Sequence, residues 1–193
     1  TGLVTFHGPV GSATWNEFTV SYLRKVLMEG QAVLCENPKV TGDNLTQVAD
    51  RIDTITAGTA RGRLLGGNLT VLSHLLGSKY VPDWKDALFF CEDVDEAPYR
   101  MDRMITQVKL CGILDEVNGF IFGKCTECDP GNGSYGSLTL EDVWSDHVRP
   151  INKPAFAGAM IGHIKQKFTI PVGIEAEMDA AAGTIRFLEG AVL

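Results

Sequence analysis

The sequence of 193 residues carries a net charge of −7, and its 45% hydrophobic and 21% charged residues are the balance of an ordinary globular protein with one sizeable core. Its scattered Lys and Arg residues exclude the basic stripe of a nucleic-acid binder, and no apolar run approaches the roughly 20 residues that span a bilayer. The N-terminus lacks the basic region of a secretory signal, and five cysteines are an odd number for a disulfide scaffold, so we expect an acidic protein of the cytoplasm.

Residues 1–40 are predicted to be the tail of an α/β domain together with a linker. Three elements are expected in this part: a buried strand over residues 2–6, a helix over residues 15–28 and a short strand over residues 31–35. The polar residues 41–44 then mark an irregular connection, which places the domain boundary near residues 30–45. The sequence also begins without Met, which is typical of a fragment or a processed product.

Residues 41–193 are predicted to form an α+β domain around a curved, mixed β-sheet. Glycines interrupt the first β-segments, over residues 52–57 and 62–65, and this suits a bulged or strongly curved sheet. From Pro98 to Leu114, apolar side chains recur on one helical face, with Pro98 in the first turn. The other expected elements are helices over residues 69–76 and 139–148, buried strands over 87–91 and 119–123, a loop over 126–137, and terminal strands over 172–178 and 184–188.

Glu92 stands where the buried strand of residues 87–91 is predicted to meet a loop, a place where a sheet can hold one carboxylate at the edge of a cleft. There it can accept a hydrogen bond from a histidine and stabilise the imidazolium, which is the orienting role in a hydrolase triad. The alternative is a solvated acidic turn before a helix, stabilised by the helix dipole. We prefer the solvated turn for Asp93, Asp95 and Glu96, and spacing alone does not decide the question for Glu92.

His163 is the best candidate for a general base among the four histidines. It follows the glycine-containing segment 158–162, and glycines permit the close backbone approach and unusual dihedral angles that aim a catalytic side chain. His7 closes a predicted strand, and His74 and His147 are predicted to lie on helices. On the residues alone, a purely structural role for His163 stays open.

Two further motifs each have a functional and a structural interpretation. Gly66-Gly67-Asn68-Leu69 is a strand-to-helix turn that can bind an anion, which makes Asn68 a candidate substrate contact; equally, Asn68 can simply cap a closely packed helix. Cys125 and Cys128 have the spacing of a metal or redox pair, but a zinc site needs about four ligands and no second pair accompanies them. We therefore expect two ordinary cysteines and no metal.

No serine lies in the Gly-x-Ser-x-Gly elbow that exposes a hydrolase nucleophile. The nearest match, Gly133-Ser134-Tyr135-Gly136, has no buried strand directly before it and no helix directly after it. The residues alone therefore indicate an α/β or α+β domain with a candidate histidine–glutamate pair.

Four short motifs, in their order along the chain, resemble the muramoyl-tetrapeptide LD-carboxypeptidase family, to which a microcin C immunity protein is related. They are Thr5-Phe6-His7-Gly8-Pro9; Gly66-Gly67-Asn68-Leu69; residues 88–93 with residues 98–103; and Gly162-His163 before Pro171-Val172-Gly173. The resemblance covers essentially the whole chain. It implies a flavodoxin-like N-terminal domain that carries a nucleophilic serine, and a C-terminal domain with a curved sheet that carries the other two members of a triad.

Matched motif by motif, the resemblance implies that Glu92 is the triad carboxylate, that His163 is the base, and that the serine lies upstream of this sequence. The implied reaction is hydrolysis of the LD amide bond to terminal D-Ala in murein tetrapeptides during cell-wall recycling, by a homodimer that needs no cofactor. The alternatives are an immunity-type hydrolase of peptidyl-adenylates and a non-catalytic truncated fragment or binding module. Without the serine, we expect this chain alone to be inactive.

Overall fold

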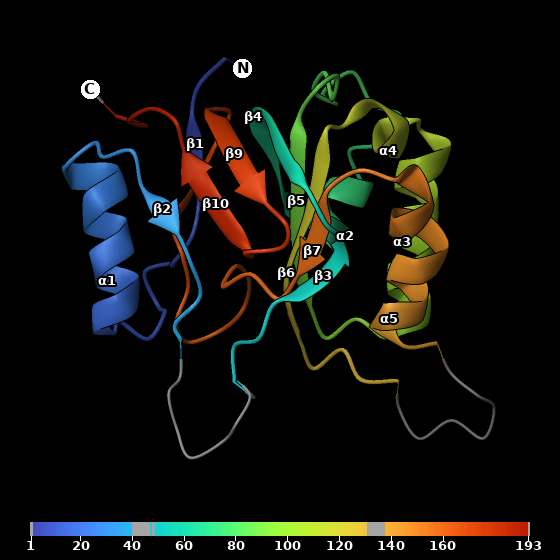
Figure 1. The fold of residues 1–193 in the computed structure, drawn as a ribbon, viewed down its shortest axis with the longest axis horizontal. Coiled ribbons are helices and arrows are strands. Elements are labelled where there is room, and N and C mark those ends of the chain that lie inside the picture. The colour runs from blue at the N-terminus through green and yellow to red at the C-terminus, as the bar shows by residue number, and fades with distance from the viewer. Residues whose placement is uncertain (1, 40–46, 48, 131–137, 193) are drawn as a thin grey trace.

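The computed structural model describes residues 2–39, 47, 49–130 and 138–192, and its centre is a curved, mixed sheet of eight strands in the order β2-β10-β9-β4-β5-β6-β7-β3 (Figure 1). The strands of this sheet are β2 (Leu34–Cys35), β3 (Asp53–Thr56), β4 (Thr59–Asn68), β5 (Leu88–Val94), β6 (Gly119–Thr126), β7 (Ala155–Ala157), β9 (Glu175–Asp179) and β10 (Thr184–Phe187). A two-stranded sheet of β1 (Thr5–His7) and β8 (Ile170–Val172) lies beside it. The predicted α+β class with a curved sheet is confirmed.

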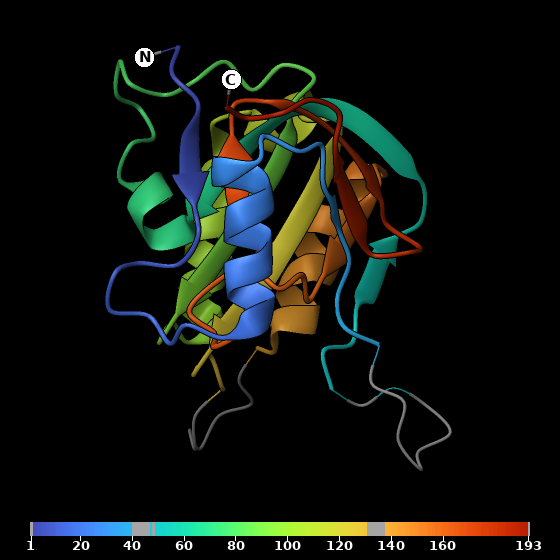
Figure 2. The same ribbon diagram turned by 90° about the vertical axis from the view of Figure 1, so that its left-hand side faces the viewer.

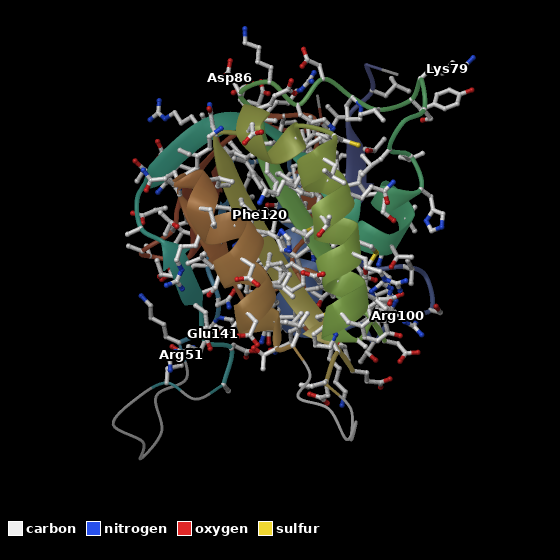
Figure 3. The ribbon with its side chains drawn as sticks, turned by 90° about the vertical axis from the view of Figure 1, so that its right-hand side faces the viewer. Arg51, Lys79, Asp86, Arg100, Phe120 and Glu141 are labelled. Atoms are coloured by element: carbon white, nitrogen blue, oxygen red, sulfur yellow. A yellow bond between two sulfur atoms is a disulfide. The ribbon has the colours of Figure 1, made fainter. Side chains whose placement is uncertain are left out.

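Helices cover both faces of the sheet. One core cluster packs the sheet against α2 (Leu69–Ser73), α3 (Pro98–Leu110), α4 (Ile113–Glu116), α5 (Leu140–Val143) and the π-helical turn η2 (Trp144–Val148), which the 3-10 turn η3 (Arg149–Ile151) follows. Figure 3 shows α3 beside the α5–η2 segment, over Phe120 of β6. The second cluster lies on the opposite face, under α1 (Glu17–Leu23), which stands in front of the sheet in Figure 2. Strands β5 to β7 and the second half of β4 are parallel, and β5, β6 and β7 are largely buried between these layers, as the apolar runs of β5 and β6 predict.

The sheet curves at β4 because the two halves of this strand pair with different neighbours. Residues 59–63 pair antiparallel with β9, and residues 64–68 pair parallel with β5. Gly66 has a φ of +152°, and a Cβ at this position would lie 1.7 Å from the carbonyl oxygen of Phe90. Only glycine permits this approach, so the glycines of β4 allow the sheet to curve, as was predicted from their positions in the sequence.

The first two predicted elements differ from the structure. β1 begins at Thr5 and lies in the small two-stranded sheet, and Leu3, Val4 and Phe6 are exposed, so the prediction of a buried strand was wrong. An apolar run fits a buried strand and an exposed edge equally well. The first helix begins at Glu17 rather than at residue 15, is capped by Asn16, and continues into the π-helical turn η1 (Arg24–Met28).

Near the C-terminus, the strand predicted over residues 172–178 is divided into β8 and β9. Between them, Gly173 has a φ of +107° and donates its N–H to the Leu64 carbonyl, while the Leu64 N–H donates to the carbonyl of Ile174. These bonds hold the chain to β4 where it passes from the small sheet to the large one. The helix predicted from Leu69 ends at Ser73, earlier than expected. Residues 41–44, and residues 131–137 of the predicted loop, lie outside the described residues.

In the described part of the chain, no helix combines the length and the apolar character needed to cross a bilayer.

Candidate active site

The carboxyl ends of the parallel strands meet at one edge of the sheet, and the predicted site residues gather there. Asn68 ends β4, Glu92 lies near the end of β5, and Thr126 ends β6. β7 leads directly into the loop that carries His163. Ligand sites of open parallel sheets form at this edge, because strand ends and loops converge there.

The structure brings Glu92 and His163 together although they are 71 positions apart in the sequence. His163 Nδ1 lies 2.9 Å from Glu92 Oε2. Glu92 is fully buried, whereas the side chain of His163 is 55% exposed. Because an ionised carboxylate only accepts hydrogen bonds, we assign the proton to Nδ1, which leaves Nε2 as the basic nitrogen.

Glu92 lies within β5, not at the strand end where the sequence placed it. Cys91 pairs with Phe122 and Asp93 pairs with Cys125, so two residues of β6 oppose Glu92 alone. A Cβ on the first of them, Gly123, would lie 2.3 Å from the carbonyl oxygen of Ile161 and 3.0 Å from Glu92 Cβ. This bulge, with glycine in it, makes room for a carboxylate inside the sheet.

The loop that carries His163 is bound to β6 at Ile161 and at His163 itself. The Lys124 N–H donates to the Ile161 carbonyl, and the Thr126 hydroxyl donates to the carbonyl of His163 at 3.0 Å. Gly162, with a φ of +132°, has no room for a side chain, because a Cβ would lie 2.7 Å from the Lys124 carbonyl oxygen and 3.1 Å from Glu92 Oε2. The glycine therefore lets the backbone pass close to the carboxylate and presents His163 to it.

A second histidine, His7, also approaches Glu92. Its Nε2 lies 3.6 Å from Glu92 Oε1, and its ring meets the ring of Phe90 edge-on at 5.7 Å. Burial lowers the pKa of His7, Glu92 raises it, and Lys167 and a protonated His163 lower it further. Sequence reasoning ranked His7 as a residue that merely closes a strand, although His7-Gly8-Pro9 is part of the first motif of the family resemblance.

Asn68 and Asp93 hold the turn at the start of α2. Asn68 Oδ1 accepts the N–H of Val71 at 3.0 Å, and Asn68 Nδ2 donates to Asp93 Oδ1 at 2.9 Å. Asp93 Oδ2 accepts both the N–H and the hydroxyl of Thr70. The protein's own carboxylate thus occupies this turn, which favours the capping interpretation over anion binding. Asp93 is 2% exposed, so its assignment to a solvated turn was wrong.

Cys125 and Cys128 form a disulfide at the end of β6, so the expectation of two ordinary, unlinked cysteines was wrong. An odd number of cysteines still allows one pair, and Cys35, Cys91 and Cys111 stay free. Sulfurs joined in a disulfide offer no thiolate to a metal. Thr126, between the paired cysteines, is the residue that binds the backbone of His163.

The described residues bring no nucleophile to the Glu92–His163 pair. Within residues 2–39, 47, 49–130 and 138–192, no serine hydroxyl makes a hydrogen bond to the ring of His163; Ser134 lies outside them. The thiol of Cys91, next to Glu92, is fully buried, and burial raises its pKa well above the ordinary value, which keeps it protonated. A hollow of about 860 Å³ beside β3 and η2 is lined by Arg51, Thr54, Trp144 and Arg149 and includes neither member of the pair.

Comparison with known proteins finds relatives that match nearly the whole chain. Residues 61–178 match the family described as "LD-carboxypeptidase C-terminal domain". A putative carboxypeptidase of Synechocystis sp. is 35% identical over 187 residues, which are 97% of this chain and 58% of that protein. A probable murein peptide carboxypeptidase of Bacillus subtilis is 35% identical over 184 residues, which are 95% of this chain and 56% of that protein.

Solved structures agree with this match. Muramoyltetrapeptide carboxypeptidase from Oxalobacter formigenes superposes with a TM-score of 0.78 at 27% identity, over 98% of this chain and 62% of that one. The microcin self-immunity protein MccF, in complex with glutamyl sulfamoyl guanosine, superposes with a TM-score of 0.82 at 22% identity, over 100% of this chain and 63% of that one, a likeness of fold. The chain spans a little over half the length of the curated relatives it matches.

Proposed function

Because this chain belongs to the LD-carboxypeptidase C-terminal domain family, we propose that it is the C-terminal part of a serine carboxypeptidase that hydrolyses the LD amide bond to terminal D-Ala in murein tetrapeptides. The family that the motifs predicted is confirmed. The observation that carries the proposal is the 2.9 Å hydrogen bond from His163 Nδ1 to the buried carboxylate of Glu92, which is the base–orienter half of a triad. The name of the Bacillus subtilis relative, a murein peptide carboxypeptidase, supports the substrate class.

In the proposed mechanism a serine attacks the amide carbonyl, and His163 Nε2 accepts the serine proton. Glu92 holds the Nδ1–H and stabilises the imidazolium that forms. His163 then protonates the nitrogen of the leaving D-Ala, and water, activated by the same base, hydrolyses the acyl-enzyme. Backbone N–H groups near the serine stabilise the oxyanion, and the mechanism uses no metal or organic cofactor.

We assign the serine to a segment outside this chain. The exposure of His163 and the length of the relatives support this assignment. In this proposal residues 1–40 are the tail and linker of the domain that carries the serine. The exposed apolar side chains of Leu3, Val4 and Phe6 suit a surface that such a domain covers.

The substrate class leads to three further parts of the proposal. Murein peptides that are recycled are processed in the cytoplasm, so we place the enzyme there. We also propose that it is a homodimer. Asn68 is our candidate for a substrate contact, because its amide nitrogen uses one hydrogen for Asp93 and has a second to donate.

An immunity-type activity on peptidyl-adenylates is the second candidate. The microcin C7 self-immunity protein of Escherichia coli is 25% identical over 124 residues, which are 64% of this chain. This relative supports a shared catalytic scaffold with a different leaving group. A non-catalytic binding module is the alternative outside the hydrolases.

The test uses the full-length protein that contains this chain. It is incubated with a murein tetrapeptide that ends in D-Ala, with the matched tetrapeptide that ends in L-Ala, and with a peptidyl-adenylate. We expect release of D-Ala and little release of L-Ala or nucleotide. Release of nucleotide alone would favour the immunity-type activity. If no substrate is cleaved and no Gly-x-Ser elbow lies upstream, the chain is a binding module and the proposal is wrong.

A further inference from the structure

The buried carboxylate of Glu92 has only one of its two oxygens hydrogen-bonded. Oε2 accepts from His163. Oε1 is buried and has no hydrogen-bond partner among the described residues. A buried, charged oxygen without a donor is costly, because it has lost its water and gained nothing in return. Nε2 of His7 lies 3.6 Å from this oxygen.

The surroundings of His7 suit a neutral hydrogen-bond donor. Its side chain is 26% exposed and faces Glu92 from β5, His163 from the loop after β7, and Lys167 from the segment before β8. Burial lowers the pKa of His7 more than Glu92 raises it, and Lys167 and a protonated His163 lower it further, so at neutral pH the ring is uncharged and carries one N–H. With that hydrogen on Nε2, the ring points a donor at Oε1.

We propose that His7 is a positioning residue of the catalytic site: its Nε2–H donates to Glu92 Oε1 and holds the carboxylate in the orientation in which Oε2 binds His163. The distance has to shorten from 3.6 Å to a normal length of about 2.9 Å for this bond to form. The carboxylate is then held from both sides by imidazole rings, and it cannot rotate away from His163. This inference rests on the proposed roles of Glu92 and His163.

Two substitutions separate a donor role from a packing role. His7→Phe keeps a ring against Phe90 but has no N–H to donate. His7→Gln loses the ring but places an amide N–H near the position of Nε2. If His7 acts as a donor, His7→Phe should lose activity and His7→Gln should keep it. If His7 acts only by packing, His7→Gln should lose activity and His7→Phe should keep it. If His7→Phe does not fold, His7→Met replaces it, since Met also lacks a donor.

The first readout is D-Ala release by the full-length protein. We expect His7→Phe to lower kcat about tenfold with KM within about twofold, because the lost bond orients the base and does not bind substrate. His7→Gln should keep kcat within about threefold. Equal activity of His7→Phe and the parent, or a larger loss in His7→Gln, would overturn the proposal.

The second readout does not depend on activity. The pKa of His163 is measured by NMR titration in this 193-residue chain and its variants. We expect His7→Phe to lower the pKa of His163, because a carboxylate that is no longer held can rotate away and stabilises the imidazolium less, and His7→Gln to leave it unchanged. An unchanged pKa of His163 in His7→Phe would contradict the proposal. If the parent enzyme releases no D-Ala and the titration still behaves as expected, the proposed function fails while the positioning role of His7 stands.

Discussion

Two imidazole rings flank the carboxylate of Glu92, and they differ in their exposure to water. The side chain of His163 is 55% exposed, which suits a base that must reach a serine and a substrate. The side chain of His7 is 26% exposed, and burial lowers its pKa. The two rings are therefore suited to different tasks, one to move a proton and the other to stay neutral.

The lowered pKa of His7 predicts a loss of stability in acid. Well above its ordinary value of 6.5, His7 is neutral in both states and contributes nothing. As the pH falls below 6.5, the unfolded chain takes up the proton first, so stability decreases, and the loss is complete once the pH is below the folded pKa. The free energy of urea unfolding, measured from about pH 7.5 to pH 5, should fall less in His7→Gln than in the parent. Parallel curves for the two proteins would contradict the assignment.

Removing either member of the proposed triad should abolish or severely depress turnover in the full-length protein. His163→Ala removes the proton acceptor and should lower kcat by about 10⁴-fold or more. Glu92→Ala removes only the group that orients this acceptor, so its loss of kcat should be equal or smaller. Folding should change little. D-Ala release is the measurement, and His74→Ala, on an exposed histidine of the turn after α2, is the control that should keep full activity. Normal turnover by His163→Ala would exclude His163 as the base.

At the scale of elements, the carboxylate of Asp93 joins the end of β5 to the start of α2. All the partners of the Asp93 carboxylate are donors: Asn68 Nδ2, the N–H of Val94, and the N–H and hydroxyl of Thr70. An asparagine there would turn an NH₂ group toward one pair of these donors. Asp95, two positions later, is exposed and has a φ of +56°, which asparagine tolerates.

We therefore predict different costs for the same substitution at these two positions. Asp93→Asn should lower the free energy of unfolding by about 2 kcal/mol, because a buried charged hydrogen-bond network loses its acceptor. Asp95→Asn should change it by less than about 0.5 kcal/mol. Chemical denaturation of the two variants measures the difference, and equal effects would show that the network around Asp93 contributes little.

The disulfide at the end of β6 predicts a definite pattern of thiol labelling in protein purified without reductant. In the native chain the exposed Cys111 should react rapidly with an alkylating reagent, whereas Cys35 and Cys91 are buried and burial raises their pKa values. The unfolded, unreduced chain should take up three labels, and the reduced chain all five. Mass spectrometry counts the labels, and five labels without reduction would show that Cys125 and Cys128 are unlinked.

At the scale of the whole molecule, the 193-residue chain contains the proposed base and its proposed orienter but, in its described residues, no serine at that base. We predict that this chain alone releases no D-Ala from a murein tetrapeptide, because a base without a nucleophile leaves only weak residual catalysis. The full-length protein, assayed in parallel, is the control and should release it. Serine-type hydrolysis by the chain alone would mean that a serine within residues 1–193 is the nucleophile.

Several features of this protein were predictable because they depend on neighbouring residues only. The apolar run before Glu92 predicted β5, and Pro98 and the apolar face that follows predicted α3. Asn68 caps α2, which is one of the two roles that the sequence left open for it. Periodicity and capping are local effects, so a sequence shows them directly. The order of the family motifs also selected Glu92 and His163, which spacing alone did not.

Other features were decided by the tertiary structure. The sequence reasoning missed or misjudged the burial of Asp93 in β5, the exposure of β1, the pairing of Cys125 with Cys128, and the approach of His7 to Glu92. Each depends on which elements, distant in the sequence, come to lie beside a residue. A strand is recognisable from its own side chains, but its burial and its contacts belong to the strands and loops packed against it, and these are set only when the sheet assembles.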